Sequence, residues 1–284
     1  MAELNLNDII HKVDELPALP QITYRVLKLT SDPKTSIAEL ANTIVKDQVL
    51  TAKVLRMANS VYYGYARRIY SISEALIILG FSTVRNLVLA ASVYTVMDKE
   101  LQGYFLPKGD LWKHCMSTAL IARSLAKKVN YELPDQAFIA GLLHDIGKIV
   151  LNTYMKESFH SVIEKVNKEN IPFMDAEQQI LGFDHAIVGS RVAEKWNLPQ
   201  ELVEAIASHH SPSRAEINPK LTSLTHIADA ASMAMGIGLG GDGMLYPFDG
   251  FATRQLNITE EIIEQTIGEI ADSMIDAETI FVDD

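Results

Sequence analysis

Near its middle the chain carries the stretch Gly141-Leu142-Leu143-His144-Asp145-Ile146-Gly147-Lys148. Here the apolar end of a predicted helix is followed at once by a histidine and an aspartate. An imidazole nitrogen and a carboxylate oxygen are ligands that suit Zn, Fe, Mn or Ni. Lys148 lies on the same side as His144 if the helix continues, because the two are four residues apart. A purely structural alternative is an aspartate after a helix end, with a histidine that interacts with the helix dipole.

Length and composition predict a folded protein of two subdomains, or one domain with a large extension, because 284 residues exceed one typical domain. No apolar run reaches the roughly 18 residues of a spanning helix, and the N-terminus lacks the regions of a signal peptide. We therefore expect a cytoplasmic protein without membrane contact. The single cysteine, Cys115, fits a reducing compartment and is expected to be a small buried hydrophobe.

The net charge of −11 is concentrated at the C-terminal end, where residues 257–284 carry nine acidic side chains and no basic one. Nucleic-acid binders depend on Lys and Arg to neutralise phosphates, so this balance argues against nucleic acid as a partner.

The pattern of the first hundred residues predicts helices and no alternating strand. Capping boxes begin at Ser36 and Ser71, and Gly80 is placed to end a helix. After a short amphipathic segment at 4–13, the helices are expected at 20–30, 36–46, 48–58 and 83–97. The pair at 36–46 and 48–58 resembles a helix-turn-helix, but its connection has no glycine, and packing or partner docking is the favoured interpretation.

A turn-rich break at residues 103–107 separates a second helical block. The prediction is an all-α fold with an N-terminal helical bundle at 1–103, packed on a helical domain at 104–284. Helices in the second block are expected at 110–129, 134–144, 150–155, 157–169, 173–180, 185–195, 199–209, 219–235 and 259–277. The glycine-rich residues 236–243 form a connector, since they follow a helix and lack a P-loop ending. The acidic last helix is expected to pack on the body or on a second chain.

Histidines and aspartates recur at the ends or on the inward faces of these predicted helices. A single histidine of this kind is more often a core or capping residue than a metal ligand. So many together favour a shared site, because an apolar core would otherwise have to supply a separate polar partner for each one. Asp110 lies one turn before His114, and His226 lies three residues before Asp229. His11 and His160 are expected at the surface. The candidate site residues are His114, His144, Asp145, His185, His209, His210 and Asp229.

Their order resembles known metal sites. His114, the His144-Asp145 pair and Asp229 are similar to the H…HD…D signature of the HD superfamily of metal-dependent phosphohydrolases. His185 and the doublet at 209–210 are similar to the extra ligands of the binuclear HD-GYP branch, which hydrolyses cyclic di-GMP. Over residues 8–235 the chain most resembles the HDOD family, the HD-related output domain of bacterial signalling proteins. The matching stretches are 16–20 (LPALP), 47–60 (DQVLTAKVLRMANS), 72–80 (ISEALIILG), 141–148 (GLLHDIGK), 184–189 (DHAIVG), 196–199 (WNLP) and 209–212 (HHSP).

The resemblance implies a helical bundle joined to an HD-like domain, with one or two divalent metal ions, Fe, Mn, Zn or Ni. His114, His144, Asp145 and Asp229 would hold one metal, and Asp145 would bridge to a second held by His185, His209 and His210. Asp145 and Lys148 would be the catalytic residues if the site is active, with Lys148 neutralising phosphate charge. Asp110 and His226 are accessory candidates.

Two functions follow from the resemblance. Many HDOD proteins have lost metal ligands and act as signalling modules, whereas this chain keeps a candidate at every ligand position. The first hypothesis is a bacterial signalling output module with a retained metal site, acting through a signalling protein partner. The alternative is a metal-dependent phosphohydrolase or phosphodiesterase acting on a nucleotide or cyclic dinucleotide, although the Gly-Tyr-Pro loop of the HD-GYP branch is absent after residue 210. An open cleft faced by Lys148 would favour the enzyme, and a site covered by the bundle or the connector would favour the module.

Overall fold

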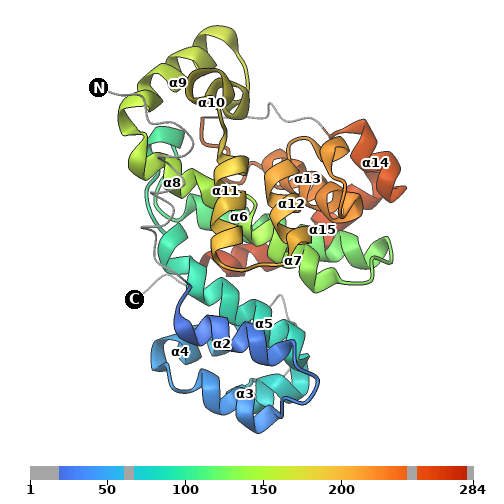
Figure 1. The fold of residues 1–284 in the computed structure, drawn as a ribbon. Helices are drawn as coiled ribbons and strands as arrows, with labels where there is room; N and C mark the ends of the chain where they lie inside the picture. The colour runs from blue at the N-terminus through green and yellow to red at the C-terminus, as the bar shows by residue number, and fades with distance from the viewer. Residues whose placement is uncertain (1–18, 61–66, 242–247, 280–284) are drawn as a thin grey trace. The chain divides into compact units, whose positions relative to one another are not determined.

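A computed structural model describes residues 19–60, 67–241 and 248–279 (Figure 1). These residues are mostly helical and contain no strand, only an isolated antiparallel bridge between Leu101 and Leu106. The all-α prediction is confirmed. The predicted segment at 4–13, His11 and the last two residues of the connector at 236–243 lie outside the described residues.

The described residues form two compact units. One consists of residues 19–60, 67–96 and 268–279, and the other of the described residues within 97–267. The first unit holds α2 (Gln21–Thr30), α3 (Ile37–Ile44), α4 (Gln48–Ala58) and nearly all of α5 (Ile72–Met97). The second holds η2 (Gln102–Tyr104), α6 (Asp110–Lys128), α7 (Pro134–Leu143), α8 (Ile146–Tyr154), α9 (Lys156–Glu169), α10 (Phe173–Leu181), α11 (His185–Lys195), α12 (Gln200–Ser208), η3 (Pro212–Arg214), α13 (Pro219–Ala234), α14 (Gly250–Leu256) and the start of α15 (Glu260–Thr279). The domain boundary between residues 103 and 104 remains a prediction.

Side-chain caps begin α3, α4 and α5 in the first unit, whereas α2 follows Pro20 without one. The Ser36 hydroxyl accepts the Glu39 N–H at 3.2 Å, and the Asp47 carboxylate accepts the Leu50 N–H at 2.9 Å. Ser71 accepts the Glu74 N–H at 3.1 Å, which confirms the N-cap at Ser71. The Glu74 carboxylate accepts the Tyr70 N–H at 2.8 Å instead of the Ser71 N–H, so only half of the second predicted capping box is formed. α5 starts there, and its helical backbone is interrupted at Gly80, where φ is 81°.

α5 is the one described helix that is long and apolar enough to cross a membrane by length and composition. Its most apolar window is 56% buried inside the structure. Core helices of ordinary domains have the same length and composition, so α5 alone is weak support for a membrane contact.

α13 is the central helix of the second unit (Figure 1). It contacts α6, α7, α12 and α14, and nearly all of its side chains are buried. α11 packs against α8 and α12, so these helices enclose one core. The core positions the histidines and aspartates described below.

Two helices differ from the sequence-based expectation. α8 begins at Ile146, four residues earlier than predicted, because helical structure resumes directly after Asp145. α14 was not predicted; it is a short helix whose N-terminal N–H groups are capped by the Asp249 carboxylate. Only two of its residues, Ala252 and Leu256, are buried, which leaves too little apolar periodicity to find it from sequence.

Candidate metal centre

His144 and Asp145 form the junction between α7 and α8. α7 ends at Leu143 and α8 starts at Ile146, and both junction side chains are fully buried. His144 Nδ1–H donates to the Gly141 carbonyl at 2.8 Å, which fixes the ring. The junction thus directs an imidazole and a carboxylate from one point of the chain into the core.

Gly147 allows α8 to approach α11 closely. A Cβ at this position would lie 1.9 Å from the His185 carbonyl oxygen. Because only hydrogen fits there, the start of α11 lies against the start of α8. This approach brings His185 Nε2 to 3.3 Å from Asp145 Oδ1.

The first group of candidate ligands combines α6, the α7–α8 junction and α13. His114 Nε2 lies 3.0 Å from Asp229 Oδ1, and His144 Nε2 lies 3.5 Å from the same oxygen. The Nε2 atoms of His114 and His144 are 3.2 Å apart. Their ligand atoms lie close enough together to hold one metal ion.

The second group comes from the start of α11 and the end of α12. His185 Nε2 and His210 Nε2 are 2.9 Å apart, and His209 completes a group with ligand atoms within 4.8 Å of one another. The structure therefore brings together all seven residues selected from the sequence.

Asp145 lies between the two groups. Its Oδ2 is 3.6 Å from His114 Nε2 and 3.5 Å from His144 Nε2. Its Oδ1 is 3.3 Å from His185 Nε2 and 4.0 Å from His209 Nε2. Each carboxylate oxygen faces a different group, which is the arrangement that a bridging ligand requires.

The Nδ1 atoms of four ligand histidines are held by acceptors, so their Nε2 atoms point inward; these are His114, His144, His185 and His209. His114 donates to the Ile237 carbonyl at 3.1 Å, and His209 donates to the Ile206 carbonyl at 2.8 Å. Metal-binding histidines typically donate their other N–H to a carbonyl or carboxylate in this way. His209 Nε2 is buried and has no hydrogen-bond partner. Facing imidazole nitrogens with no donor between them require a shared positive charge, either a proton or a metal ion.

The pKa shifts of the buried side chains indicate the same need for a positive charge in the cluster. Burial disfavours charge on His185, but the Glu177 carboxylate outweighs burial and raises the pKa of His185 to about 9. Burial would raise the pKa of Asp145, but Lys148 and the neighbouring histidines hold it well below its usual value. Burial, with His144 nearby, lowers the pKa of His209 to about 3. The ionised Asp145 carboxylate thus faces a neutral imidazole at His209 and a protonated one at His185, and a divalent cation of the Fe, Mn, Zn or Ni type would take the place of that proton.

Glu177 is a site residue that the sequence analysis missed. This fully buried carboxylate on α10 accepts the His185 backbone N–H and its Nδ1–H, both at 2.8 Å, and also the Tyr104 hydroxyl. A signal was present, because Glu177 follows Phe173 by one turn on the buried face of α10, where a charge needs a partner.

The two accessory candidates have different places. The Asp110 carboxylate lies at the surface, 4.0 Å from Lys113 Nζ, and is not part of the cluster. His226 is buried, donates from Nδ1 to the His209 carbonyl at 2.8 Å and accepts the Asp249 N–H at Nε2 at 2.9 Å. It therefore holds the backbone of a candidate ligand. His160 is exposed beside Glu164, as predicted.

Lys148 is buried and faces the cluster. Its Nζ lies 2.8 Å from Asp145 Oδ2 and 5.6 Å from the centre of the Tyr104 ring. In this position its charge compensates a carboxylate. The buried Cys115 also lies nearby, and burial raises the pKa of its thiol well above the usual value, which suits the predicted hydrophobic role.

The described part of the connector covers one side of the cluster. A Cβ on Gly238 would lie 2.5 Å from His114 Cβ, and the Gly241 N–H donates to the Tyr104 carbonyl at 2.9 Å. On the other side, His210 is half-buried and lines a pocket of about 660 Å³ together with Arg191 and Arg214. His210 is therefore the candidate ligand nearest to an open pocket.

The fold and the cluster define an all-α protein with an HD-type His/Asp centre. The chain belongs to the HDOD domain family, whose pattern matches residues 16–212.

Solved structures show the same fold. An HDOD domain protein of unknown function from Geobacter sulfurreducens is 28% identical, with a TM-score of 0.81 and 97% of each chain covered. A proposed phosphohydrolase from Shewanella amazonensis SB2B is 25% identical, with a TM-score of 0.76 and coverage of 96% of this chain and 97% of that one. An uncharacterized protein of Treponema pallidum is 26% identical over 76% of this chain, which spans 42% of that relative.

Proposed function

We propose that this chain is a bacterial signalling output module of the HDOD type. In this proposal its HD-type centre holds one or two divalent metal ions, and the protein acts by binding a signalling partner protein. His114, His144 and Asp229 would hold one metal, His185, His209 and His210 the other, and Asp145 would bridge them.

The observation that carries the metal part of the proposal is the position of Asp145. Its two oxygens face two separate groups of imidazole nitrogens, at 3.3–4.0 Å. Without a metal ion, the two buried carboxylates depend on protons held by the surrounding imidazoles, and a divalent cation would replace those protons. Lys148 supplies one positive charge, which compensates only one of the two carboxylates.

The burial of the ligands supports a module over an enzyme. His114, His144, Asp145, His185, His209 and Asp229 are at most 3% exposed. Gly238 packs directly on His114, so a phosphoryl group has no room on that side without movement of the connector. A centre closed in this way is suited to holding the fold in one conformation for a partner.

One observation favours the alternative, a metal-dependent phosphohydrolase or phosphodiesterase acting on a nucleotide or cyclic dinucleotide. The pocket beside His210 carries Arg191 and Arg214 and could admit a phosphate. Bound metal ions would activate a water molecule and polarise the phosphoryl oxygens. Lys148 would then balance charge at Asp145.

Metal analysis combined with a hydrolysis assay separates these functions. Protein purified without chelator is expected to contain about one or two metal ions per chain, and a His144→Ala/Asp145→Ala variant none. The metal-loaded protein is expected to hydrolyse bis(p-nitrophenyl) phosphate and p-nitrophenyl phosphate no faster than the variant does. If the wild-type protein hydrolyses either ester and the double substitution abolishes that hydrolysis, the enzyme is the correct function and the signalling module is not. If wild-type protein contains no metal, the proposed metal centre is wrong.

A further inference from the structure

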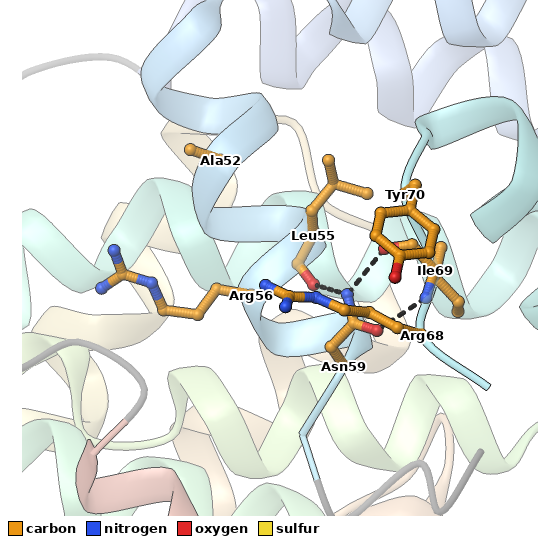
Figure 2. A pocket seen from close by; sticks show the side chains of 7 residues that line it. All are labelled: Ala52, Leu55, Arg56, Asn59, Arg68, Ile69 and Tyr70. Carbon is orange, nitrogen blue, oxygen red and sulfur yellow. Dashed lines mark hydrogen bonds between the residues drawn. The ribbon is translucent and has the colours of Figure 1, made fainter. Parts of the chain in front are cut away.

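A separate hollow lies in the unit that does not contain the metal centre. It has a volume of about 680 Å³ and lies between one face of α4 and the segment that precedes α5 (Figure 2). Ala52, Leu55, Arg56 and Asn59 recur at helical spacing along α4, and residues 68–70 form the opposite wall. The volume falls in the range of small-molecule sites, about 300–1,000 Å³.

Asn59 joins the two walls. Its side-chain N–H groups donate to the Leu55 and Ile69 carbonyls, each at 2.8 Å, and its Oδ1 accepts the Ile69 N–H at 2.7 Å (Figure 2). The buried Ile69 is thereby fixed against α4. The Tyr70 N–H donates to the Glu74 carboxylate at 2.8 Å, so the second wall is also anchored to the start of α5. The hollow is therefore preformed, and the Asn59 amide is already engaged.

The polar groups that face the hollow are mainly donors. Of the described residues that line it, two are arginines and none is acidic. The Arg68 guanidinium lies 5.8 Å from the centre of the Tyr70 ring and forms no ion pair with any described residue. The whole chain has a net charge of −11, whereas the described lining of this hollow is positively charged. A ligand with several acceptor oxygens fits such a lining.

We propose that this hollow binds a small phosphate-bearing ligand of the nucleotide class. The guanidinium forks of Arg56 and Arg68 match phosphate oxygens in a bidentate manner. Tyr70 is 73% exposed and, with Leu55 and Ala52, offers the surface for a planar ring. Two arginines that line one small hollow suit a single phosphate group. The repeated carboxylates of an acidic peptide would need a longer row of basic side chains.

The proposal goes beyond the proposed function and is independent of it. No residue of the hollow belongs to the metal centre, and the two sites lie in different units. A bound nucleotide would supply a signalling module with a small-molecule input.

Calorimetric titration of the whole 284-residue chain with adenosine 5′-monophosphate tests the proposal. Binding is expected, and Arg56→Gln and Arg68→Gln are each expected to weaken it about tenfold or more, because each removes charge-assisted hydrogen bonds. Arg68→Lys keeps the charge but not the fork, so it should weaken binding less than Arg68→Gln. All three variants are expected to fold normally, since both arginines are exposed.

Three controls make the result decisive. Arg25→Gln removes an exposed arginine on α2 outside the hollow and is expected to leave affinity unchanged. The His144→Ala/Asp145→Ala variant should bind the nucleotide normally, whatever happens to its metal. Adenosine without phosphate should bind at least about tenfold more weakly. Equal losses in the Arg25 and Arg68 variants, absence of nucleotide binding, or tighter binding of a polyglutamate peptide would each overturn the proposal.

Discussion

Glu177 receives two hydrogen bonds from His185, one from the backbone N–H and one from Nδ1–H, each at 2.8 Å. This carboxylate fixes both the start of α11 and the orientation of the imidazole ring. The ring then presents Nε2 to Asp145 and His210.

Replacing Glu177 by Gln should weaken metal binding about 10- to 100-fold, as is usual when the partner of a ligand histidine is lost. The amide keeps the shape but no longer holds the His185 N–H with a full negative charge. Zinc titration in competition with a chelator measures the affinity. Glu164→Gln, which alters an exposed carboxylate beside His160, is the matched control and should have no effect. Equal zinc affinities of Glu177→Gln and wild type would exclude the role given to Glu177.

The Glu177–His185 pair should make the metal-free protein less stable at alkaline pH. The pKa of His185 is raised to about 9 in the folded state against 6.5 for a free histidine. The folded state therefore holds an extra proton between these values, so this stabilisation is complete below pH 6.5 and is lost as the pH rises through 9. The loss is of the order of 3 kcal/mol at about 1.4 kcal/mol for each pKa unit.

Urea unfolding of chelator-treated protein at pH 6.5 and pH 9.5 tests this pH dependence. The free energy of unfolding should fall more for wild type than for Glu177→Gln, whose His185 has a lower pKa. A fall of the same size in both proteins would assign the alkaline loss to other groups.

Gly147→Ala should separate α8 from α11. The added Cβ would meet the His185 carbonyl oxygen at 1.9 Å, and backbone cannot move aside as a flexible side chain does. We expect a loss of about 1–3 kcal/mol or more in unfolding free energy, together with weaker metal binding. Gly268→Ala in α15 is the control, because nothing lies within 4 Å of its Cβ position. There alanine should stabilise by up to about 1 kcal/mol, by helix propensity. Normal metal affinity in Gly147→Ala would contradict the proposed dependence on this approach.

Lys148→Met should make stability depend more strongly on metal. Without metal, the substitution leaves Asp145 buried without the amine 2.8 Å away, at a cost of about 3–5 kcal/mol. With metal bound, the cation compensates the carboxylate, so the cost should be smaller. Melting temperatures measured with zinc and with chelator give both values.

Lys165→Met is the matched control for Lys148. Lys165 forms a surface ion pair with Glu169 at 2.9 Å, and its loss should cost less than about 1 kcal/mol with or without metal. If the Lys148 variant loses the same stability in zinc as in chelator, the cation does not balance Asp145.

The sequence determined the helical class, most of the helix ranges and the seven candidate ligands. Helical periodicity and capping are local properties, so Ser36, Ser71 and Gly80 could be assigned from their neighbours alone. The histidines stood out because they recur at the ends or on the inward faces of apolar helices, where an imidazole needs a partner.

Only the tertiary structure decided how these residues are arranged. It placed one oxygen of Asp145 toward each group, selected Glu177 as the partner of His185, left Asp110 at the surface and laid Gly238 on His114. Spacing along the chain predicts which side of one helix a residue occupies. The distance between residues on different helices depends on how closely their backbones approach, and here that approach is set by contacts such as the one at Gly147, which no local pattern contains.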